Sequence, residues 1–174
     1  MLDLPTLETE RLRFRAFREE DVAPMAAFYA DEANARFVGG VEPPDTVWRR
    51  VAFYVGHWHF RGYGIWALEE KAGGRFVGYC GHYYPQGWYE PEIAYGLMGY
   101  AQGRGLATEA AGAALRDAYA RLGWRTAISA IDVNNIPSRR VAERIGATRE
   151  DELRMAGFDA VIYRHRPPGE VLAG

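Results

Sequence analysis

The chain has 174 residues, of which 48% are hydrophobic and 25% are charged, and this composition is typical of one folded globular domain spanning residues 1–174. Its formal net charge of −2 argues against a general nucleic-acid-binding surface. A single cysteine, Cys80, excludes an internal disulfide framework and fits a reducing compartment, where we expect it to be a small buried residue. Because the N-terminus lacks an apolar signal segment and no uncharged run could cross a bilayer, we predict a cytoplasmic protein with no membrane partner.

Hydrophobic periodicity and turn residues predict the elements of the first half of the chain. Alternating charged and apolar side chains at residues 11–15 predict a strand, which we place at the edge of a sheet. Two helices with apolar stripes are predicted next, followed by two antiparallel strands joined by a glycine-containing hairpin. These four elements cover residues 19–29, 43–62, 64–69 and 76–81.

The central stretch, residues 92–122, predicts a strand, a loop and a helix in succession. The strand covers residues 92–97, and apolar residues recur at spacings of three and four along the helix. Between them, Gly103 and Gly105 let the backbone turn tightly and bring amide N–H groups together at the positive end of the helix. That geometry suits a phosphate, and the alternative is that the two glycines only make a tight connection.

Two nucleotide-binding motifs are excluded by residues that their chemistry requires. A P-loop needs a lysine followed by Ser or Thr at the helix start, and the only lysine of the chain is Lys71. A dinucleotide-binding fingerprint needs a third glycine, but that position holds Thr108, and Arg125 already begins the next predicted strand. A third kind of phosphate loop therefore remains.

The last part of the chain predicts a strand, a helix and a closing hairpin. The strand covers residues 126–131, and the helix begins near Pro137 and ends at Gly146. The hairpin strands cover residues 148–153 and 160–165. No internal repeat, linker or low-complexity segment divides the chain, which again predicts one domain.

Three segments of the chain resemble the GNAT superfamily of acetyl-coenzyme-A-dependent N-acetyltransferases. Residues 102–107 match the family's pyrophosphate loop, in which Gln or Arg is followed by two residues, Gly, one residue, and Gly or Ala. Residues 92–95 and 135–146 resemble the branch that includes ribosomal-protein N-terminal acetyltransferases of the RimJ/RimL type. The resemblance covers nearly the whole chain and implies a GNAT fold of the α/β (α+β) class, a mixed, mostly antiparallel sheet flanked by helices.

The resemblance implies an N-acetyltransferase that moves an acetyl group from acetyl-CoA, its cosubstrate, directly to an amine. The amine would belong to a protein N-terminus or a small molecule, and the enzyme would be a monomer or a homodimer with no metal and no nucleic-acid partner. A non-catalytic acyl-CoA-binding or scaffold domain of the same fold is the alternative. It would keep the loop at residues 102–107 without needing acid–base residues, so thioester turnover separates the two.

Transfer to an amine needs a base, because an ammonium group cannot attack a thioester. Glu92, at the start of the central strand, is our first candidate and Glu90 the second, although either could be a solvated surface acid or a binding group for a cationic substrate. The tyrosine with which the family often protonates the leaving thiolate would fall at Ala142, so this chain lacks it. The resemblance suggests Ser138 as the substitute. Alternatively, a thiolate, whose thiol pKa is about 8.5, leaves unprotonated, and Ser138 is only a helix-cap or helix-surface hydroxyl.

The resemblance assigns acetyl-CoA binding to the central strand, the loop and the starts of the two following helices. Strand amides would pair with the pantetheine arm, Arg104 would add charge at the pyrophosphate, and Asn135, also a helix-cap candidate, would bind the arm. The implied cofactor-binding residues are Ile93, Ala94, Tyr95, Leu97, Gln102, Gly103, Arg104, Gly105, Ala107, Thr108, Asn135 and Ser138.

Other kinds of site are disfavoured. His57 and His59 lie two residues apart on a predicted helix and point in different directions, and no Cys or carboxylate cluster joins them or His82, so we predict no metal site. No Gly-x-Ser-x-Gly elbow indicates a hydrolase. The acceptor determinants are expected within residues 37–62 and 86–91, whose aromatic side chains pack in the core or line a pocket or subunit contact.

Overall fold

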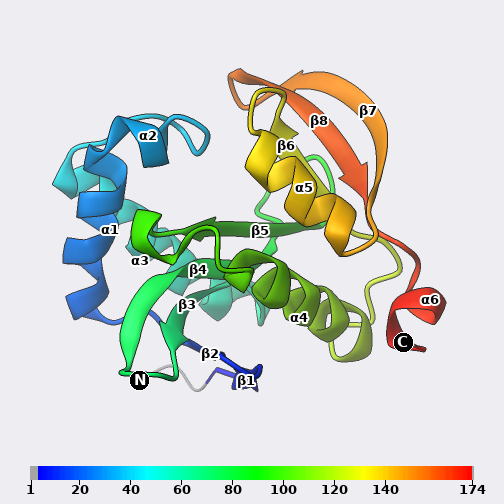
Figure 1. The fold of residues 1–174 in the computed structure, drawn as a ribbon, viewed down its shortest axis with the longest axis horizontal. Helices are drawn as coiled ribbons and strands as arrows, with labels where there is room; N and C mark the ends of the chain where they lie inside the picture. The colour runs from blue at the N-terminus through cyan, green and yellow to red at the C-terminus, as the bar shows by residue number, and fades with distance from the viewer. Residues whose placement is uncertain (1–3, 174) are drawn as a thin grey trace.

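The strands form one mixed sheet in the computed structural model, which describes residues 4–173 (Figure 1). The strands are β1 (Leu7–Glu8), β2 (Leu12–Arg15), β3 (Ile65–Glu70), β4 (Arg75–Tyr83), β5 (Glu92–Leu97), β6 (Ile128–Asp132), β7 (Thr148–Met155) and β8 (Phe158–Arg164). The helices are η1 (Glu19–Asp21), α1 (Val22–Ala30), α2 (Glu32–Ala35), α3 (Pro44–Arg61), η2 (Gly99–Ala101), α4 (Leu106–Ala120), α5 (Ile136–Arg144) and α6 (Pro168–Leu172). The order in the sheet is β1-β2-β3-β4-β5-β6-β8-β7, and of the neighbouring pairs only β5 and β6 run parallel. The predicted mixed, mostly antiparallel sheet flanked by helices is therefore confirmed.

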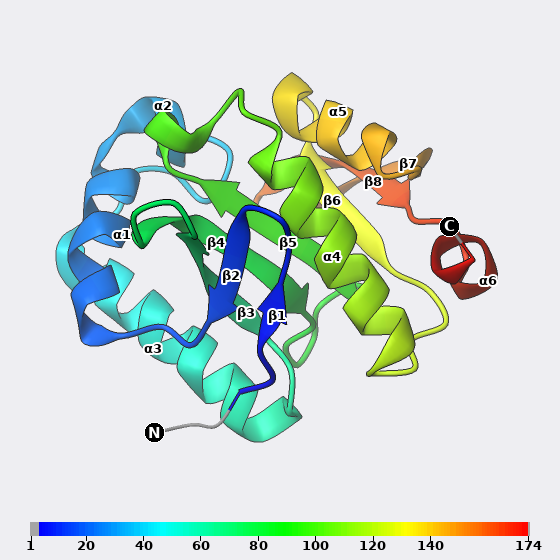
Figure 2. The ribbon, with the colours of Figure 1, turned by 60° about the horizontal axis from the view of Figure 1, so that its bottom comes forward.

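Helices cover the centre of the sheet (Figure 2). The α4 helix packs against β4 and β5, and α3 packs against β3. Consecutive residues of β3 and β4 are buried, so both faces of these strands are covered. One large apolar cluster joins α1, α3 and α4 to strands β2–β5. Within residues 4–173, no helix combines the length and the apolarity needed to cross a bilayer.

The C-terminal strands pack around separate, smaller apolar clusters. Ile131, Val161 and Tyr163 meet Ala142 of α5, while Ile128 packs with two residues of β8. These strands join the rest of the sheet through β5 and β6, which pair at a single position, Glu92 opposite Ile128. The sheet thus consists of two halves that separate just after this position.

The structure corrects four details of the predicted elements. The expectation that residues 11–15 form an edge strand is wrong, because the two-residue strand β1 pairs with β2 and takes the edge. A strand of two residues is too short to show a period. The strand predicted at residues 126–131 begins at Ile128 and ends at Asp132, and the central helix ends at Ala120. The short helices α2 and α6 were not predicted.

Candidate active site

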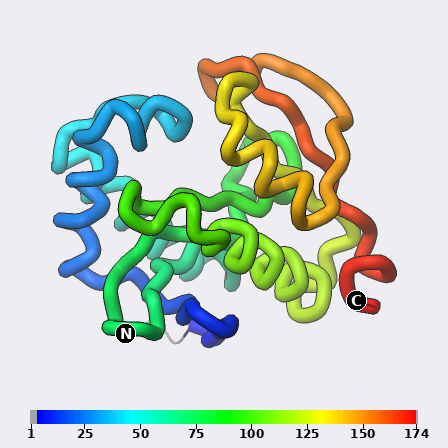
Figure 3. Tube along the Cα trace, viewed as in Figure 1, coloured from blue at the N-terminus to red at the C-terminus, as the bar shows by residue number. Residues whose placement is uncertain are grey.

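The gap between β5 and β6 lies where two cavities meet. A cavity of about 450 Å³ borders the start of α4, and a cavity of about 290 Å³ extends towards α1 and α3. Figure 3 shows the surrounding arrangement, with α1 and α2 on one side of β5 and α5 with the β7–β8 hairpin on the other. The two cavities share the lining residues Phe37, Val38, Tyr95, Asn135 and Ser138. We call the first the loop cavity and the second the inner cavity.

The loop cavity is built around the N-terminus of α4. Gly103 and Gly105 have φ values of +71° and +79°, a backbone region that only glycine adopts without strain. Gly105 is the N-cap of α4 and no side chain caps it, so the first amides of the helix keep their N–H groups for another acceptor. Arg140 and Arg144, one turn apart on α5, line the same cavity. Backbone amides and two guanidinium groups therefore make it a suitable place for an anion.

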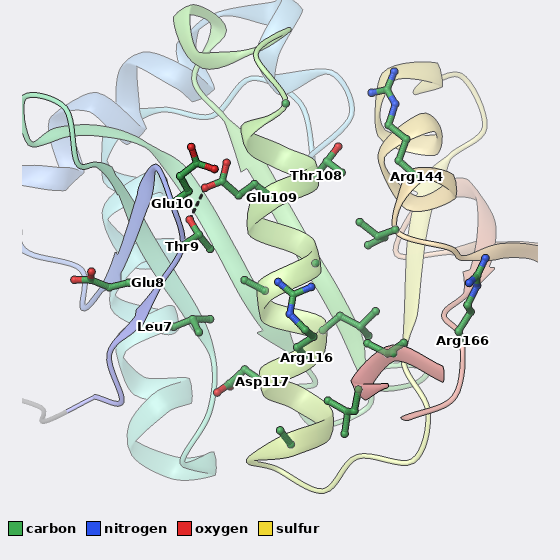
Figure 4. Close-up of a pocket in the computed structure, with 18 of the residues that line it drawn as sticks. Leu7, Glu8, Thr9, Glu10, Thr108, Glu109, Arg116, Asp117, Arg144 and Arg166 are labelled. Carbon is green, nitrogen blue, oxygen red and sulfur yellow. Dashed lines mark hydrogen bonds between the residues drawn. The ribbon is translucent and has the colours of Figure 1, made fainter. Parts of the chain in front are cut away.

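The loop is held from behind by the N-terminal hairpin. Arg11 donates from Nη1 to the Arg104 carbonyl oxygen (2.8 Å) and from Nε to Glu109 (2.6 Å). Glu109 also accepts a hydrogen bond from Thr9 Oγ1 (2.6 Å), which Figure 4 shows within an open groove between the β1–β2 turn, α4 and α6. These bonds fix the loop in place before any ligand binds.

The predicted loop residues differ in where their side chains lie. Gln102 donates from Nε2 to the Leu97 carbonyl oxygen (2.9 Å), which ties the loop to the end of β5. The Arg104 guanidinium forms an ion pair with Glu70 and does not line the loop cavity. The predicted residues that do line it are Tyr95, Leu97, Gln102, Gly103, Gly105, Ala107, Thr108, Asn135 and Ser138. Ile93 and Ala94 line the inner cavity instead.

Glu92 is a buried carboxyl group in the wall of the inner cavity. Its side chain accepts hydrogen bonds from Trp88 Nε1 (2.7 Å) and from the Ala130 amide (3.2 Å), and the residue is 6% exposed. Burial raises the pKa of the Glu92 carboxyl to about 7, although the two hydrogen bonds favour the ionised form and oppose this rise. A carboxyl group with this pKa can accept a proton near neutral pH and release it again.

Glu90 lies in a different environment. Its carboxylate pairs with the Arg164 guanidinium at 2.6 and 2.8 Å, and it does not line the inner cavity. The structure therefore brings Glu92, and not Glu90, together with the other predicted site residues. Trp88 was not singled out from the sequence, although it lies within residues 86–91, where acceptor determinants were expected, and it lines the inner cavity.

Ser138 lies where the two cavities join. Its hydroxyl donates to the Tyr95 hydroxyl oxygen (3.0 Å), and the Tyr95 hydroxyl donates to the Ser138 carbonyl oxygen (3.0 Å). Asn135 accepts a hydrogen bond from the Ser138 amide (3.2 Å), as an N-cap residue does, so its predicted capping role is confirmed. Ala142 is fully buried. Hydroxyl groups at the junction of the cavities are thus supplied by Ser138 and Tyr95.

Ser129 joins β6 to β5 where their backbone pairing ends. Its hydroxyl donates to the Ile93 carbonyl oxygen (2.9 Å) and lies 3.0 Å from His165 Nε2. Because the Ser129 hydroxyl gives its proton to the carbonyl oxygen, His165 Nε2 must donate to the Ser129 oxygen. Burial lowers the pKa of the His165 imidazole to about 4. Neither residue was predicted, because both follow from a pairing between distant strands. Within residues 4–173, no group of three or more His, Cys, Asp and Glu side chains could hold a metal ion.

A sheet that opens beside an uncapped helix N-terminus, with a buried carboxyl group at the opening, is the arrangement that the resemblance to the GNAT acetyltransferases implies. Comparison with known proteins agrees. Residues 11–148 match the family described as "Acetyltransferase (GNAT) domain". An acetyltransferase structure from Agrobacterium tumefaciens is 30% identical, covers 95% of this chain and 96% of its own, and superposes with a TM-score of 0.86.

Two further comparisons extend this result. The uncharacterized protein YkkB of Bacillus subtilis is 29% identical over 168 residues, which are 92% of this chain and 95% of that protein. The structure of RimL, a ribosomal L7/L12 α-N-protein acetyltransferase in complex with coenzyme A, is 21% identical over 94% of this chain and 99% of its own, with a TM-score of 0.74, and shows a shared fold. The chain belongs to the GNAT acetyltransferase family and is an N-acetyltransferase with the GNAT fold.

Proposed function

We propose that the protein transfers an acetyl group from acetyl-CoA directly to an amine in a ternary complex, with Glu92 as the base. The observation that carries the proposal is the Glu92 carboxyl group, which is buried in the inner cavity beside the gap and has a pKa of about 7. An ordinary surface carboxylate would be too weak a base to compete for an ammonium proton at neutral pH.

The loop cavity fits the anionic part of acetyl-CoA. The uncapped amides of α4 and the guanidinium groups of Arg140 and Arg144 would hold the pyrophosphate, and Arg104 would contribute through its backbone while its side chain stays with Glu70. The edge of β5 that faces the gap lacks a paired strand beyond Glu92, so its backbone groups would bind the amides of the pantetheine arm. The thioester then lies at the junction of the two cavities.

The acceptor amine would enter the inner cavity and lose its proton to Glu92. The neutral amine forms the new C–N bond at the thioester carbonyl carbon, the C–S bond breaks, and the thiolate leaves. For this step the Ser138 hydroxyl would turn from Tyr95, to which it donates in the structure, towards the departing sulfur and give it a proton. The nitrogen of the product carries one proton more than an amide, and this proton would pass to Ser138 and restore its hydroxyl. Glu92 would then release to solvent the proton that it took from the ammonium group.

The acceptor is proposed to be a protein N-terminus or a small-molecule amine, as in the RimJ/RimL branch. One observation supports the branch, the Asn135–Ser138 segment at the junction, because the fold shared with RimL is common to the whole family. The proposal includes a cytoplasmic enzyme that works as a monomer or a homodimer without a metal ion, a nucleic acid or a membrane.

Release of free thiol from acetyl-CoA with a panel of amines tests the proposal. Glu92→Gln keeps the shape of the side chain but cannot accept a proton, so turnover at neutral pH should fall by roughly 10²- to 10⁴-fold while acetyl-CoA still binds. Higher pH should partly restore the variant, because more of the amine is then neutral. Glu90→Gln is the control and should turn over normally. Normal turnover by Glu92→Gln across the pH range would contradict the assignment, and acetyl-CoA binding without turnover of any amine would favour a scaffold domain.

A further inference from the structure

The inner cavity is small and largely aromatic. At about 290 Å³ it lies at the lower limit of ordinary small-molecule sites. Its rings would surround an apolar or aromatic body and leave little room for a large polar acceptor. The aromatic residues that line it are Tyr29, Phe37, Tyr54, Tyr79, Tyr83, Trp88, Tyr95 and Phe158.

Arg50 of α3 is the one cationic side chain among the described residues that line the inner cavity. Its guanidinium lies 4.7 Å from the centre of the Tyr29 ring. Its Nε and Nη2 groups donate to Glu42, with Nε 3.2 Å from the carboxylate, whereas Nη1 makes no hydrogen bond of normal geometry within residues 4–173. The guanidinium also lies near the Tyr54 hydroxyl and opposes the rise in its pKa that burial causes. Glu42 does not line the cavity. The guanidinium is therefore fixed by Glu42 and retains a donor for another group.

Tyr29 supplies a second donor. The residue is fully buried, and within residues 4–173 its hydroxyl has no hydrogen-bond partner of normal geometry, although the hydroxyl groups of Tyr54 and Tyr79 lie near it. Burial raises the pKa of this hydroxyl above its usual range, so it carries its proton at neutral pH. A buried donor without a partner destabilises the folded protein, and a ligand atom that accepts its hydrogen bond would remove this cost.

The two donors and the base belong to different walls of the cavity. Tyr29 and Arg50 come from α1 and α3, whereas Glu92 lies at the bridge between β5 and β6 (Figure 1). Burial raises the pKa of the Tyr83 hydroxyl to about 12, Tyr54 and Glu92 add to the rise, and Arg50 opposes it, so both charged groups act on this hydroxyl. The cavity thus offers a proton acceptor at one wall and, at another, a guanidinium group that is held in place by its ion pair with Glu42.

We propose that the acceptor is a small amine that also carries a carboxylate, with its amine at Glu92 and its carboxylate at Arg50 and Tyr29. The rings of the cavity enclose the apolar or aromatic part between the two groups. This inference rests on the proposed acetyl transfer to an amine and narrows the acceptor to amino-acid-like molecules. Most protein N-termini, those that do not begin with Asp or Glu, offer no carboxylate at a short distance from the amine, so they fit the Arg50 wall less well.

Matched pairs of acceptors test this directly, with thiol release as the readout. The pairs are 4-(aminomethyl)benzoate against benzylamine, and phenylalanine against phenethylamine, each with and without the carboxylate. A series of amino acids with growing separation between amine and carboxylate finds the best span. A hydrogen-bonded charge pair is worth about 1.5–3 kcal/mol, so the best acid should exceed its partner about 10- to 100-fold in kcat/KM.

Variants of two neighbouring arginines on α3 give a second test that is independent of the choice of acceptor. Arg50→Gln should lower kcat/KM for the acids about 10- to 100-fold and leave benzylamine nearly unchanged. Arg49→Gln is the matched control, because Arg49 is the exposed neighbour that pairs with Asp45 on the helix surface. The double variant Arg50→Gln/Glu42→Gln removes the ion pair without leaving Glu42 unpaired, and acetyl-CoA affinity reports that each variant is folded.

The outcomes are distinct. Equal or better turnover of the amines without a carboxylate, or an equal loss with both kinds of acceptor in Arg50→Gln, overturns the substrate class but not the transfer reaction. A preference for peptides with a free N-terminus also overturns it, in favour of a protein acceptor. Absence of thiol release with every amine, in a protein that binds acetyl-CoA, overturns the proposed function and this inference with it.

Discussion

Replacing Trp88 by Phe should raise the pKa of Glu92 and shift the pH dependence of the reaction. The indole donates a 2.7 Å hydrogen bond to the Glu92 carboxylate, and this bond lowers the pKa of a group that burial holds at about 7. Hydrogen bonds to charged groups contribute about 1.5–3 kcal/mol, and each pKa unit corresponds to about 1.4 kcal/mol. The variant carboxyl should therefore titrate about 1 to 2 pH units higher.

The measurement is kcat/KM against pH with one acceptor for all variants, so that the ionisation of the amine is common to each curve. The parent should lose activity as pH falls through about 7, the pKa of Glu92. In Trp88→Phe this loss of activity should occur about 1 to 2 pH units higher. The activity at pH 7 should then be roughly 5- to 50-fold lower than that of the parent, while the activity at high pH should be nearly unchanged. The aromatic ring at this position is retained, so its edge-to-face contact with Tyr83 changes little.

Trp48→Phe is the control. Trp48 also donates its indole N–H to a glutamate, Glu19, at 3.3 Å, but this pair is exposed and does not line the inner cavity. Its pH profile should match that of the parent. If the pH at which activity falls is the same in Trp88→Phe as in the parent, or if Trp48→Phe shifts it equally, the reasoning that the Trp88 indole lowers the pKa of Glu92 is refuted.

Three further predictions concern the loop, the leaving group and stability. Gly105→Val and Gly123→Val both place a side chain at positive φ, +79° and +67°, so both should lower stability by a similar amount. Only Gly105→Val should abolish the acetyl-CoA binding that calorimetry measures. If Gly105→Val binds acetyl-CoA as tightly as the parent, the loop is not part of the site. Ser138→Ala should lower kcat at least about 10-fold with acetyl-CoA affinity nearly intact, and an unchanged rate where chemistry limits turnover would leave Ser138 a structural role only. Glu92→Gln should gain stability relative to the parent as pH rises: the difference in the free energy of unfolding should increase by up to about 3 kcal/mol between pH 4.5 and about 7. The reason is that, in this range, the folded parent holds a proton on Glu92 that its unfolded chain has released. Urea unfolding at pH 5 and pH 8 measures this difference, and a value that does not change with pH would contradict the raised pKa of Glu92.

The elements with a strong local pattern could be predicted from the sequence. The α4 helix has apolar side chains at regular helical spacing, and the Gly103-x-Gly105 loop before it can only turn in this way because both glycines adopt positive φ. Strand β1 escaped prediction because two residues carry no period, and its existence depends on pairing with β2.

The position of a candidate base could be predicted from the sequence, but its pKa and the directions of long side chains could not. Glu92 was identified from its position at the start of the central strand, but its pKa depends on burial and on Trp88, which only the folded chain provides. Arg104 lies in the loop motif, yet its side chain turns to Glu70, because a motif fixes the backbone and not the direction of a long side chain. Arg50 is one of twenty arginines, and nothing in its neighbourhood along the chain distinguishes it from Arg49.

The single bridge between β5 and β6 gives the sheet two edges in the interior of the molecule. On a molecular surface, such edges invite strands of other chains and promote aggregation. Here α4 and α5 contact each other, and residues at the start of α4 and on α5 line the loop cavity beside the gap. Helices therefore cover these two edges, so that they are less open to strands of other chains than edges at the surface would be. An extended ligand with amide groups of its own could satisfy the unpaired backbone of β5 without adding a strand to the sheet.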